Sequence, residues 1–231
     1  MENMFFNYEF KFENGEKTKI VIELKKEDLN IVNLVFDEKK ECNELKNFKC
    51  PNCKLQGNKE CPVLKNLLVI VEEFKTKHSY DKCEIKVETR ERVYIKYDSL
   101  QSGIGSLMGI IMVSSGCPTL EKLKPMVKFH LPFATIEETM YRAASMYLMA
   151  QHLRNKDGKI AKYDLREIAD IYAEIEKINV HMARQLNKIN ICDASINAIV
   201  LLNSFASFAN ITFGDEFEKM MKSYFKVYLD N

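Results

Sequence analysis

The feature of this sequence that most constrains its fold is a set of four cysteines between residues 42 and 61. Cys42, Cys50, Cys53 and Cys61 have the spacing C-x7-C-x2-C-x7-C. Two thiolates separated by two residues can bind one metal ion when the turn between them is tight, and Pro51 favours such a turn. Cys61 can fold back onto this turn at little entropic cost, because the connecting loop is short. The stretch therefore predicts a metal site with thiolate ligands.

The fourth ligand has two candidates. Cys42 would make the site wholly local, whereas Cys117, in the stretch Ser115-Gly116-Cys117-Pro118, would connect the cysteine loop to a distant part of the chain. Four thiolates are typical of structural zinc, and they also suit an iron–sulfur cluster. The alternative is a set of reduced cysteines, some of them buried as small apolar side chains. Disulfides are less favoured, because the count of seven is odd and no apolar signal peptide begins the chain.

Composition narrows the classes of function. The 231 residues are 46% apolar and 29% charged, which is ordinary for a globular protein and sufficient for one sizeable core. The net charge of +1 gives no general attraction to nucleic acid or to an anionic membrane. The longest apolar run, from Ile104 to Val113, is too short to span a bilayer and predicts a buried helix. We therefore expect a cytoplasmic protein that binds neither nucleic acid nor membrane.

Hydrophobic periodicity predicts strands in the first half of the chain. Alternating side chains indicate one hairpin over residues 1–25, with its turn at Asn14-Gly15, and a second hairpin over residues 83–97. On the second hairpin Cys83 faces the expected core. Arg92, Tyr94 and Lys96 form a polar stripe, which is typical of a solvated face and is alternatively a contact for an anionic ligand.

Apolar residues at three- and four-residue steps predict a helix that begins just after Pro62 and several more in the second half of the chain. The expected fold class is α+β, with a small antiparallel sheet of two hairpins and a cysteine metal loop packed on a helical C-terminal half. We expect a single domain over residues 1–231, with an α+β part over 1–118 and a helical part over 119–231. Apolar and aromatic residues over 217–228 are typical of a core or of a homodimer face.

A second candidate site lies before the first helix of the C-terminal half. Thr135-Ile136-Glu137-Glu138 has the pattern of a capping box, so a helix is expected to begin there. Lys128 and His130 lie just before it, and a helix N-terminus beside a cation suits a carboxylate or phosphate group. The alternative is that His130 is a packed, hydrogen-bonded histidine without a ligand.

A set of short motifs runs through the chain: Cys50-x2-Cys53-x7-Cys61-Pro62-Val63, Ser99-Leu100-Gln101-x-Gly103, Ser115-Gly116-Cys117-Pro118, Lys124-Pro125-Met126, Phe129-His130-Leu131-Pro132-Phe133-Ala134-Thr135, Glu137-Glu138-Thr139 and Tyr141-Arg142. Together these motifs resemble an uncharacterised bacterial family, a domain of unknown function, over about residues 5–228. The family brings no settled activity with it.

The resemblance implies that Cys50, Cys53, Cys61 and Cys117 form one constellation, with Cys42 an addition in this chain. It also implies a group of ligand-binding residues gathered near the cysteines: Arg92, Gln101, His130, Glu138 and Arg142.

Three functions remain as hypotheses. The first is a metal-binding protein, with structural zinc favoured, that has a regulatory, sensing or adaptor role toward a protein partner or a small ligand. The second is an iron–sulfur protein that senses redox state or transfers electrons. The third is an enzyme that uses His130 with Glu137 or Glu138 as acid–base groups, although no nucleophile, base and orienting residue can be assigned together.

Overall fold

The computed structural model describes residues 2–36, 49–56, 60–188, 193–213 and 215–230, without the side chains of residues 210, 211 and 216. These residues form an α+β fold with one antiparallel sheet and helices that lie mostly in the C-terminal half, as predicted. Cys42 and Cys192 lie outside the described residues, so the prediction of Cys42 as a ligand stays a prediction. No helix in the described ranges is long and apolar enough to cross a bilayer.

The sheet has five strands in the order β3-β2-β1-β4-β5, and every neighbouring pair is antiparallel. The first predicted hairpin is β1 (Met4–Phe12) with β2 (Lys17–Leu24), and the second is β4 (Lys82–Glu88) with β5 (Val93–Ser99). Strand β3 (Ile31–Phe36) was not predicted, because it is an edge strand whose burial does not alternate cleanly. The sheet is therefore a three-stranded meander joined to a hairpin.

One helix lies directly against the inner face of this sheet. Helix α2 (Leu100–Ser114) is buried along most of its length, as the apolar run predicts. It approaches the sheet at Gly103, where an added Cβ would lie 2.6 Å from a ring carbon of Phe10 and 2.8 Å from Cδ1 of Ile85. Only glycine permits this contact, so α2 and the central strands share one packed core.

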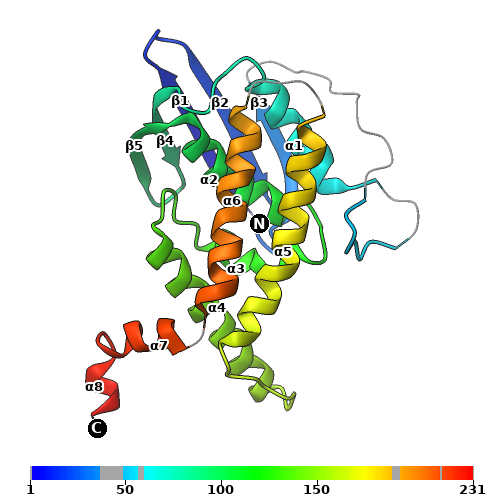
Figure 1. Cartoon of the computed structure of the whole chain (residues 1–231). Helices are drawn as coiled ribbons and strands as arrows, with labels where there is room; N and C mark the ends of the chain where they lie inside the picture. The colour runs from blue at the N-terminus through cyan, green and yellow to red at the C-terminus, as the bar shows by residue number, and fades with distance from the viewer. Residues whose placement is uncertain (1, 37–48, 57–59, 189–192, 214, 231) are drawn as a thin grey trace.

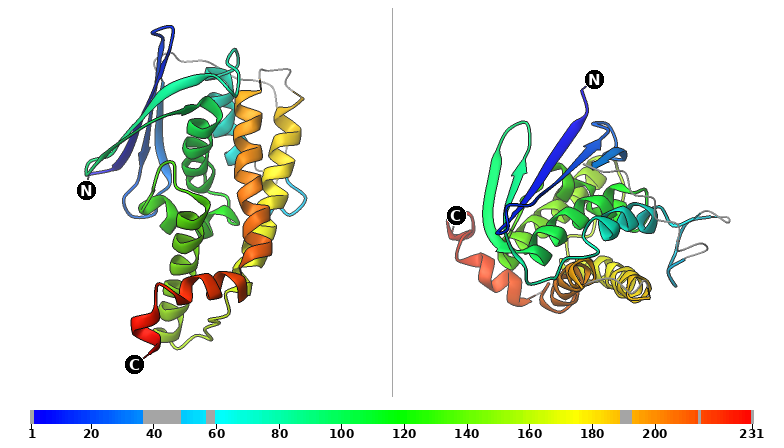
Figure 2. Two further views of the ribbon diagram at one scale, coloured as in Figure 1. Left: turned by 60° about the vertical axis from the view of Figure 1, so that its left-hand side comes forward. Right: turned by 90° about the horizontal axis from the view of Figure 1, so that it is seen from above.

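The other helices complete a third layer and the ends of the molecule. Helices α5 (Arg166–Leu186) and α6 (Ala194–Thr212) lie side by side over α2, on the side away from the sheet (Figures 1 and 2). Seen from above, the sheet curves along one side of the helices (Figure 2). The remaining elements are α1 (Pro62–Glu73), η1 (Leu120–Leu123), α3 (Lys124–Lys128), α4 (Ile136–Lys156), α7 (Asp215–Lys222) and α8 (Lys226–Leu229).

A carboxylate connects the third layer to the sheet. Asp193 occupies the N-cap position of α6, but its side chain makes no capping hydrogen bond. It accepts hydrogen bonds from the backbone N–H and the hydroxyl of Ser79, at 2.8 and 2.9 Å, and from the side-chain amide of Asn197 at 2.9 Å. These contacts fix the start of α6 to the segment that leads into β4.

Candidate functional site

Four cysteines come together from three separate segments of the fold. Cys50 and Cys53 form a tight turn, in which the N–H of Cys53 donates to the carbonyl of Cys50 at 3.1 Å. Cys61 is the N-cap residue of α1, which begins at Pro62 as predicted. Cys117 follows α2, and its carbonyl accepts the N–H of Glu121 at 2.9 Å, where η1 begins. Cys83 is fully buried on β4, in the core position predicted for it.

The sulfurs of Cys61, Cys117 and Cys53 lie close enough to the thiol of Cys50 to affect its pKa. The thiol of Cys50 donates a hydrogen bond to the sulfur of Cys61, which lowers the pKa of Cys61 and raises that of Cys50. Burial and the neighbouring sulfurs of Cys61, Cys117 and Cys53 raise the pKa of Cys50 further. The amides of Leu64 and Val63 also lower the pKa of Cys61, without a capping hydrogen bond of good geometry.

The cysteines have the chemistry of a metal site but not its ligand geometry. Each of the five described cysteines is a free thiol. In the described part of the chain, no group of three or more histidine, cysteine or carboxylate side chains is spaced as ligands around an ion. Four converging sulfurs are nevertheless the donor set of a structural zinc site.

The cysteine turn is anchored to the helical layer. The side-chain amide of Asn52 donates to the backbone carbonyl of Glu174 on α5 at 3.1 Å and to its carboxylate at 2.8 Å. One amide nitrogen thus donates two hydrogen bonds to the same residue, which fixes Asn52 and attaches the cysteine turn to α5.

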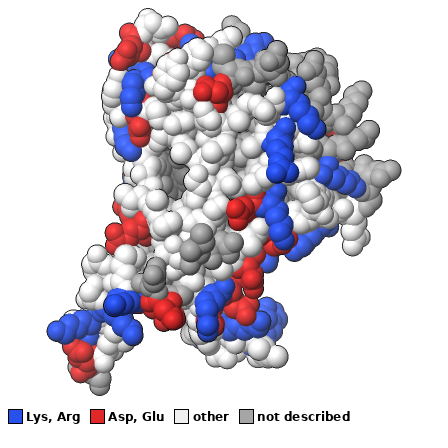
Figure 3. Space-filling model, in the orientation of Figure 1, with Lys and Arg blue, Asp and Glu red and all other residues white. Residues whose placement is uncertain are grey.

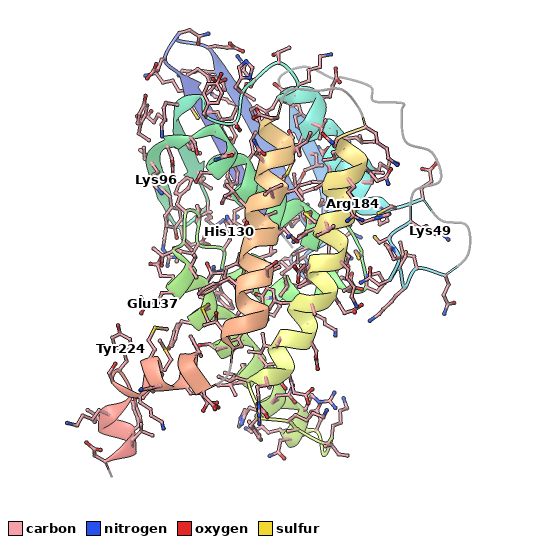
Figure 4. The ribbon with its side chains drawn as sticks, in the orientation of Figure 1. Lys49, Lys96, His130, Glu137, Arg184 and Tyr224 are labelled. Carbon is pink, nitrogen blue, oxygen red and sulfur yellow. The ribbon has the colours of Figure 1, made fainter. Side chains whose placement is uncertain are left out.

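His130 lies in a different part of the molecule, beside α6 in Figure 4. Its Nε2 is 2.9 Å from the hydroxyl of Tyr8 and 3.2 Å from the hydroxyl of Ser106, and these two hydroxyls are 3.0 Å apart. The ring of Phe6 packs edge-on against the imidazole, with 5.4 Å between ring centroids. Burial, assisted by the charge of Arg142, lowers the pKa of His130 to about 3. The imidazole is therefore neutral at physiological pH, as in the packed-histidine alternative.

Arg142 extends from α4 toward the same region. Its Nη2 donates to the backbone carbonyls of Met126 at 2.9 Å and Phe129 at 2.6 Å. Neither Nε nor Nη1 has a hydrogen-bond partner among the residues that the structure describes, and within these residues the guanidinium forms no ion pair. Burial lowers the pKa of Arg142, since the surroundings disfavour its charge.

His130 and Arg142 each line two neighbouring cavities. The first, the apolar cavity, has a volume of about 630 Å³ and is lined by residues of α2, η1, α3, α4, α5, α6 and the 129–135 loop. The second, the basic cavity, measures about 460 Å³ and is lined by five basic and two acidic residues, among others. Figure 3 shows that the face carrying α6 is largely uncharged and hollowed beside that helix.

Two buried polar side chains line the apolar cavity without a partner. Tyr172 and Asn179, both on α5, are 3% and 2% exposed. Neither side chain has a hydrogen bond to another residue in the described ranges. Burial raises the pKa of Tyr172, so its hydroxyl is protonated and able to donate. The wall opposite α5 includes Phe133, whose φ of 59° places a bulky residue in the left-handed region.

The family resemblance implies a group of five ligand-binding residues, and only some of them lie together in the structure. Arg92, His130 and Arg142 line the basic cavity together, whereas Gln101 lines neither cavity. Glu138 forms the predicted capping box with Thr135, in which its carboxylate accepts the Thr135 N–H at 2.7 Å. None of the five described cysteines lines either cavity, so these residues and the described cysteines are two distinct sites.

The polar stripe on β5 is solvated as predicted, since Arg92 and Lys96 are exposed, but it lies on the face of the sheet that carries the buried residues Ile85 and Val87 of β4. Tyr94 and Arg92 line the basic cavity, and the ammonium of Lys96 lies 5.9 Å from the ring centroid of Phe133. The alternate residues Val93, Ile95 and Tyr97 are 51%, 62% and 58% exposed. Both faces of β5 therefore reach solvent, and part of the polar stripe also lines the basic cavity.

The acid–base hypothesis requires a carboxylate that acts with His130, but both candidate carboxylates make hydrogen bonds elsewhere. The carboxylate of Glu138 is engaged in the capping box, and that of Glu137 accepts a hydrogen bond from Tyr224 at 3.3 Å, at the lower left of Figure 4. Tyr172 and Asn179 were missed as site residues. Tyr172 matched the apolar stripe of α5, and the only signal for Asn179 was an amide on that same buried face.

Comparisons with known proteins add a family and nothing on activity. No curated protein and no solved structure matches the chain. A family model described as "Domain of unknown function (DUF6901)" matches residues 6–226, which include the cysteine cluster, the apolar cavity and the basic cavity except for its lining residues 2–5. By that match, the chain belongs to the DUF6901 family.

Proposed function

We propose that this chain is a metal-binding protein in which Cys50, Cys53, Cys61 and Cys117 hold one zinc ion. The observation that carries the proposal is the convergence of four free thiols from the cysteine turn, the N-terminus of α1 and the end of α2. Zinc bound by four thiolates has no open coordination position, so its role is structural. It would hold the cysteine loop against the end of α2 and stabilise the fold. A cytoplasmic location suits the proposal, because reduced thiols persist there.

Elemental analysis of protein purified without oxygen and without chelators tests the proposal. We expect about one zinc per chain and no visible colour. Cys50→Ser is expected to lower zinc content and the melting temperature together. One of the four ligands is lost, and with it the part of the folding free energy that zinc binding supplies. Cys83→Ala is the matched control: it removes a buried thiol from β4, so it lowers stability but leaves zinc content unchanged.

Two further variants identify the fourth ligand. If Cys117 binds the ion, Cys117→Ser lowers zinc affinity and Cys42→Ser does not. The reverse result would assign the fourth position to Cys42. Unchanged zinc content in Cys50→Ser, or purified protein without any metal after zinc supplementation, would contradict the proposal.

An iron–sulfur cluster is the second candidate for the same ligands, because thiolate sites accept either centre. Iron with acid-labile sulfide, together with a visible absorption band that bleaches on reduction, would favour it. In that case the four cysteines would hold a redox centre instead of a structural ion.

A further inference from the structure

We infer that the apolar cavity and the adjoining basic cavity form one binding site for an amphipathic anion, a molecule with a linear apolar chain and a negatively charged head group. The chain would lie in the apolar cavity and the head group beside Arg142. The inference does not depend on the proposed zinc site, since Cys50, Cys53, Cys61 and Cys117 line neither cavity.

The size and lining of the apolar cavity fit the chain of such a ligand. Its volume of about 630 Å³ lies within the range of about 300–1,000 Å³ that is usual for small-molecule sites. Apolar side chains from α2, α6 and the 129–135 loop supply most of the wall. Ile136, Leu201 and Phe208, which line it, are themselves 53%, 43% and 42% exposed. The cavity is therefore open to solvent along an apolar rim through which a chain can enter.

Arg142 supplies the charge for the head group. It lines both cavities, and two of its donor nitrogens, Nε and Nη1, have no partner in the part of the chain that the structure describes. A partly buried guanidinium without an ion pair is costly unless an anion neutralises it. The basic cavity beside it also includes Lys26, Arg92 and Lys128 in its lining, so the local charge favours a negative group.

The unpartnered polar groups give the site its orientation. Tyr172 and Asn179 are buried residues that line the apolar cavity, and neither side chain makes a hydrogen bond within the described ranges. Polar groups at the wall of an apolar pocket fix the orientation of a bound ligand. Arg142 also exerts its charge on Tyr172, so both side chains act on the same region. A carboxylate or phosphate placed there could accept from both.

Three ligands with the same twelve-carbon chain test the inference by calorimetry: dodecanoate, dodecyl phosphate and dodecanol. We expect both anions to bind, and dodecanol to bind at least about tenfold more weakly, since it lacks a charge-assisted hydrogen bond to Arg142. The order of the two anions identifies the head group as a carboxylate or a phosphate. Equal affinity for dodecanol and dodecanoate, or no binding of either anion, would overturn the inference.

Matched variants place the ligand in the cavities. Arg142→Gln should weaken the anions at least about tenfold and leave dodecanol unchanged. Arg184→Gln removes the same charge from an exposed position on α5, away from His130 in Figure 4, and should leave all three affinities unchanged. If the anions bind to Arg142→Gln as tightly as to the wild-type protein, the head-group assignment is wrong.

A cavity-filling variant tests the chain position independently of Arg142. Gly109 on α2 lines the apolar cavity, and an added Cβ would meet only Cδ2 of Leu202, at 3.9 Å. Gly109→Ala should therefore fold and bind normally, whereas Gly109→Leu should place its larger side chain in the cavity and abolish binding of all three ligands. Unchanged binding by a folded Gly109→Leu protein would exclude the apolar cavity as the site, even if Arg142→Gln failed to fold.

Discussion

At the scale of single residues, His130 shows how much the sequence can and cannot indicate. Its two interpretations, a ligand-binding group or a packed histidine, could not be separated from the sequence, because Tyr8 and Ser106 lie 122 and 24 residues away. In the structure the imidazole is hydrogen-bonded to both hydroxyls, and its lowered pKa keeps it neutral at physiological pH. Burial and the charge of Arg142 both oppose protonation of His130, so it is a poor base at neutral pH. Its protonation in acid should destabilise the fold.

This low pKa predicts acid sensitivity of the fold. Because the pKa of His130 is about 3 in the folded chain and 6.5 ordinarily, the unfolded state binds the proton first as the pH falls. The free energy of unfolding should therefore decrease by up to about 1.4 kcal/mol per pH unit between these values, from this residue alone. Denaturant titrations at pH 7, 6 and 5 measure the slope above the range where most carboxylates titrate.

His130→Gln should flatten that slope, since it removes the titrating group and keeps a side-chain amide near Tyr8. His152→Gln, which removes an exposed histidine of α4, is the matched control. If His130→Gln and the wild-type protein lose stability equally between pH 7 and pH 5, His130 is not protonated on unfolding in this range.

At the scale of elements, residues close in sequence predicted turns and helix starts correctly. The face of the sheet on which the side chains of a strand lie could not be predicted in this way. The Asn14-Gly15 turn, Pro62 at the start of α1 and the capping box at Thr135 all depend on residues close in sequence, and the structure confirms each of them. The strand β3 and the orientation of β5 depend on what covers each face of the sheet. That information lies in helices far along the chain, so alternation alone could not supply it.

The capping box of α4 allows a direct test at this scale. Thr135→Ala removes the acceptor for the N–H of Glu138, 3.1 Å away, and should lower the free energy of unfolding by about 1 kcal/mol. Thr135→Ser keeps the hydroxyl and should cost much less. Denaturant unfolding of the three proteins measures the difference, and equal losses for the alanine and serine variants would show that the cap contributes nothing.

At the scale of the whole molecule, the fold class was accessible from the sequence and the cavities were not. Periodicity indicates two hairpins and one helix before residue 100 and helices after it, and the structure has these elements together with strand β3. The apolar cavity draws its walls from segments between residues 102 and 208. Each of these segments, taken alone, has the apolar pattern of an ordinary core. A cavity arises only because their packed shapes leave space, and a single sequence does not report that space.

The cysteine cluster and the apolar cavity share a stretch of chain. The carbonyl of Cys117 holds the start of η1 through Glu121, and Leu120, Leu123 and Val127, just beyond, form part of the cavity wall. An ion at Cys117 and a ligand against this wall would both favour the same ordered conformation of residues 117–127. Thermodynamic linkage then requires that each raise the affinity for the other by the same factor.

Removing zinc with a chelator should accordingly weaken dodecanoate binding, and saturating dodecanoate should slow zinc loss. Calorimetry with and without the metal, and zinc release followed with a colorimetric chelator, measure the two sides of this cycle. Equal dodecanoate affinity in both metal states would show that the two sites are energetically independent. If they are coupled, the turn at Cys117 links the two sites, so that the supply of a metal ion sets the affinity of the protein for a small molecule.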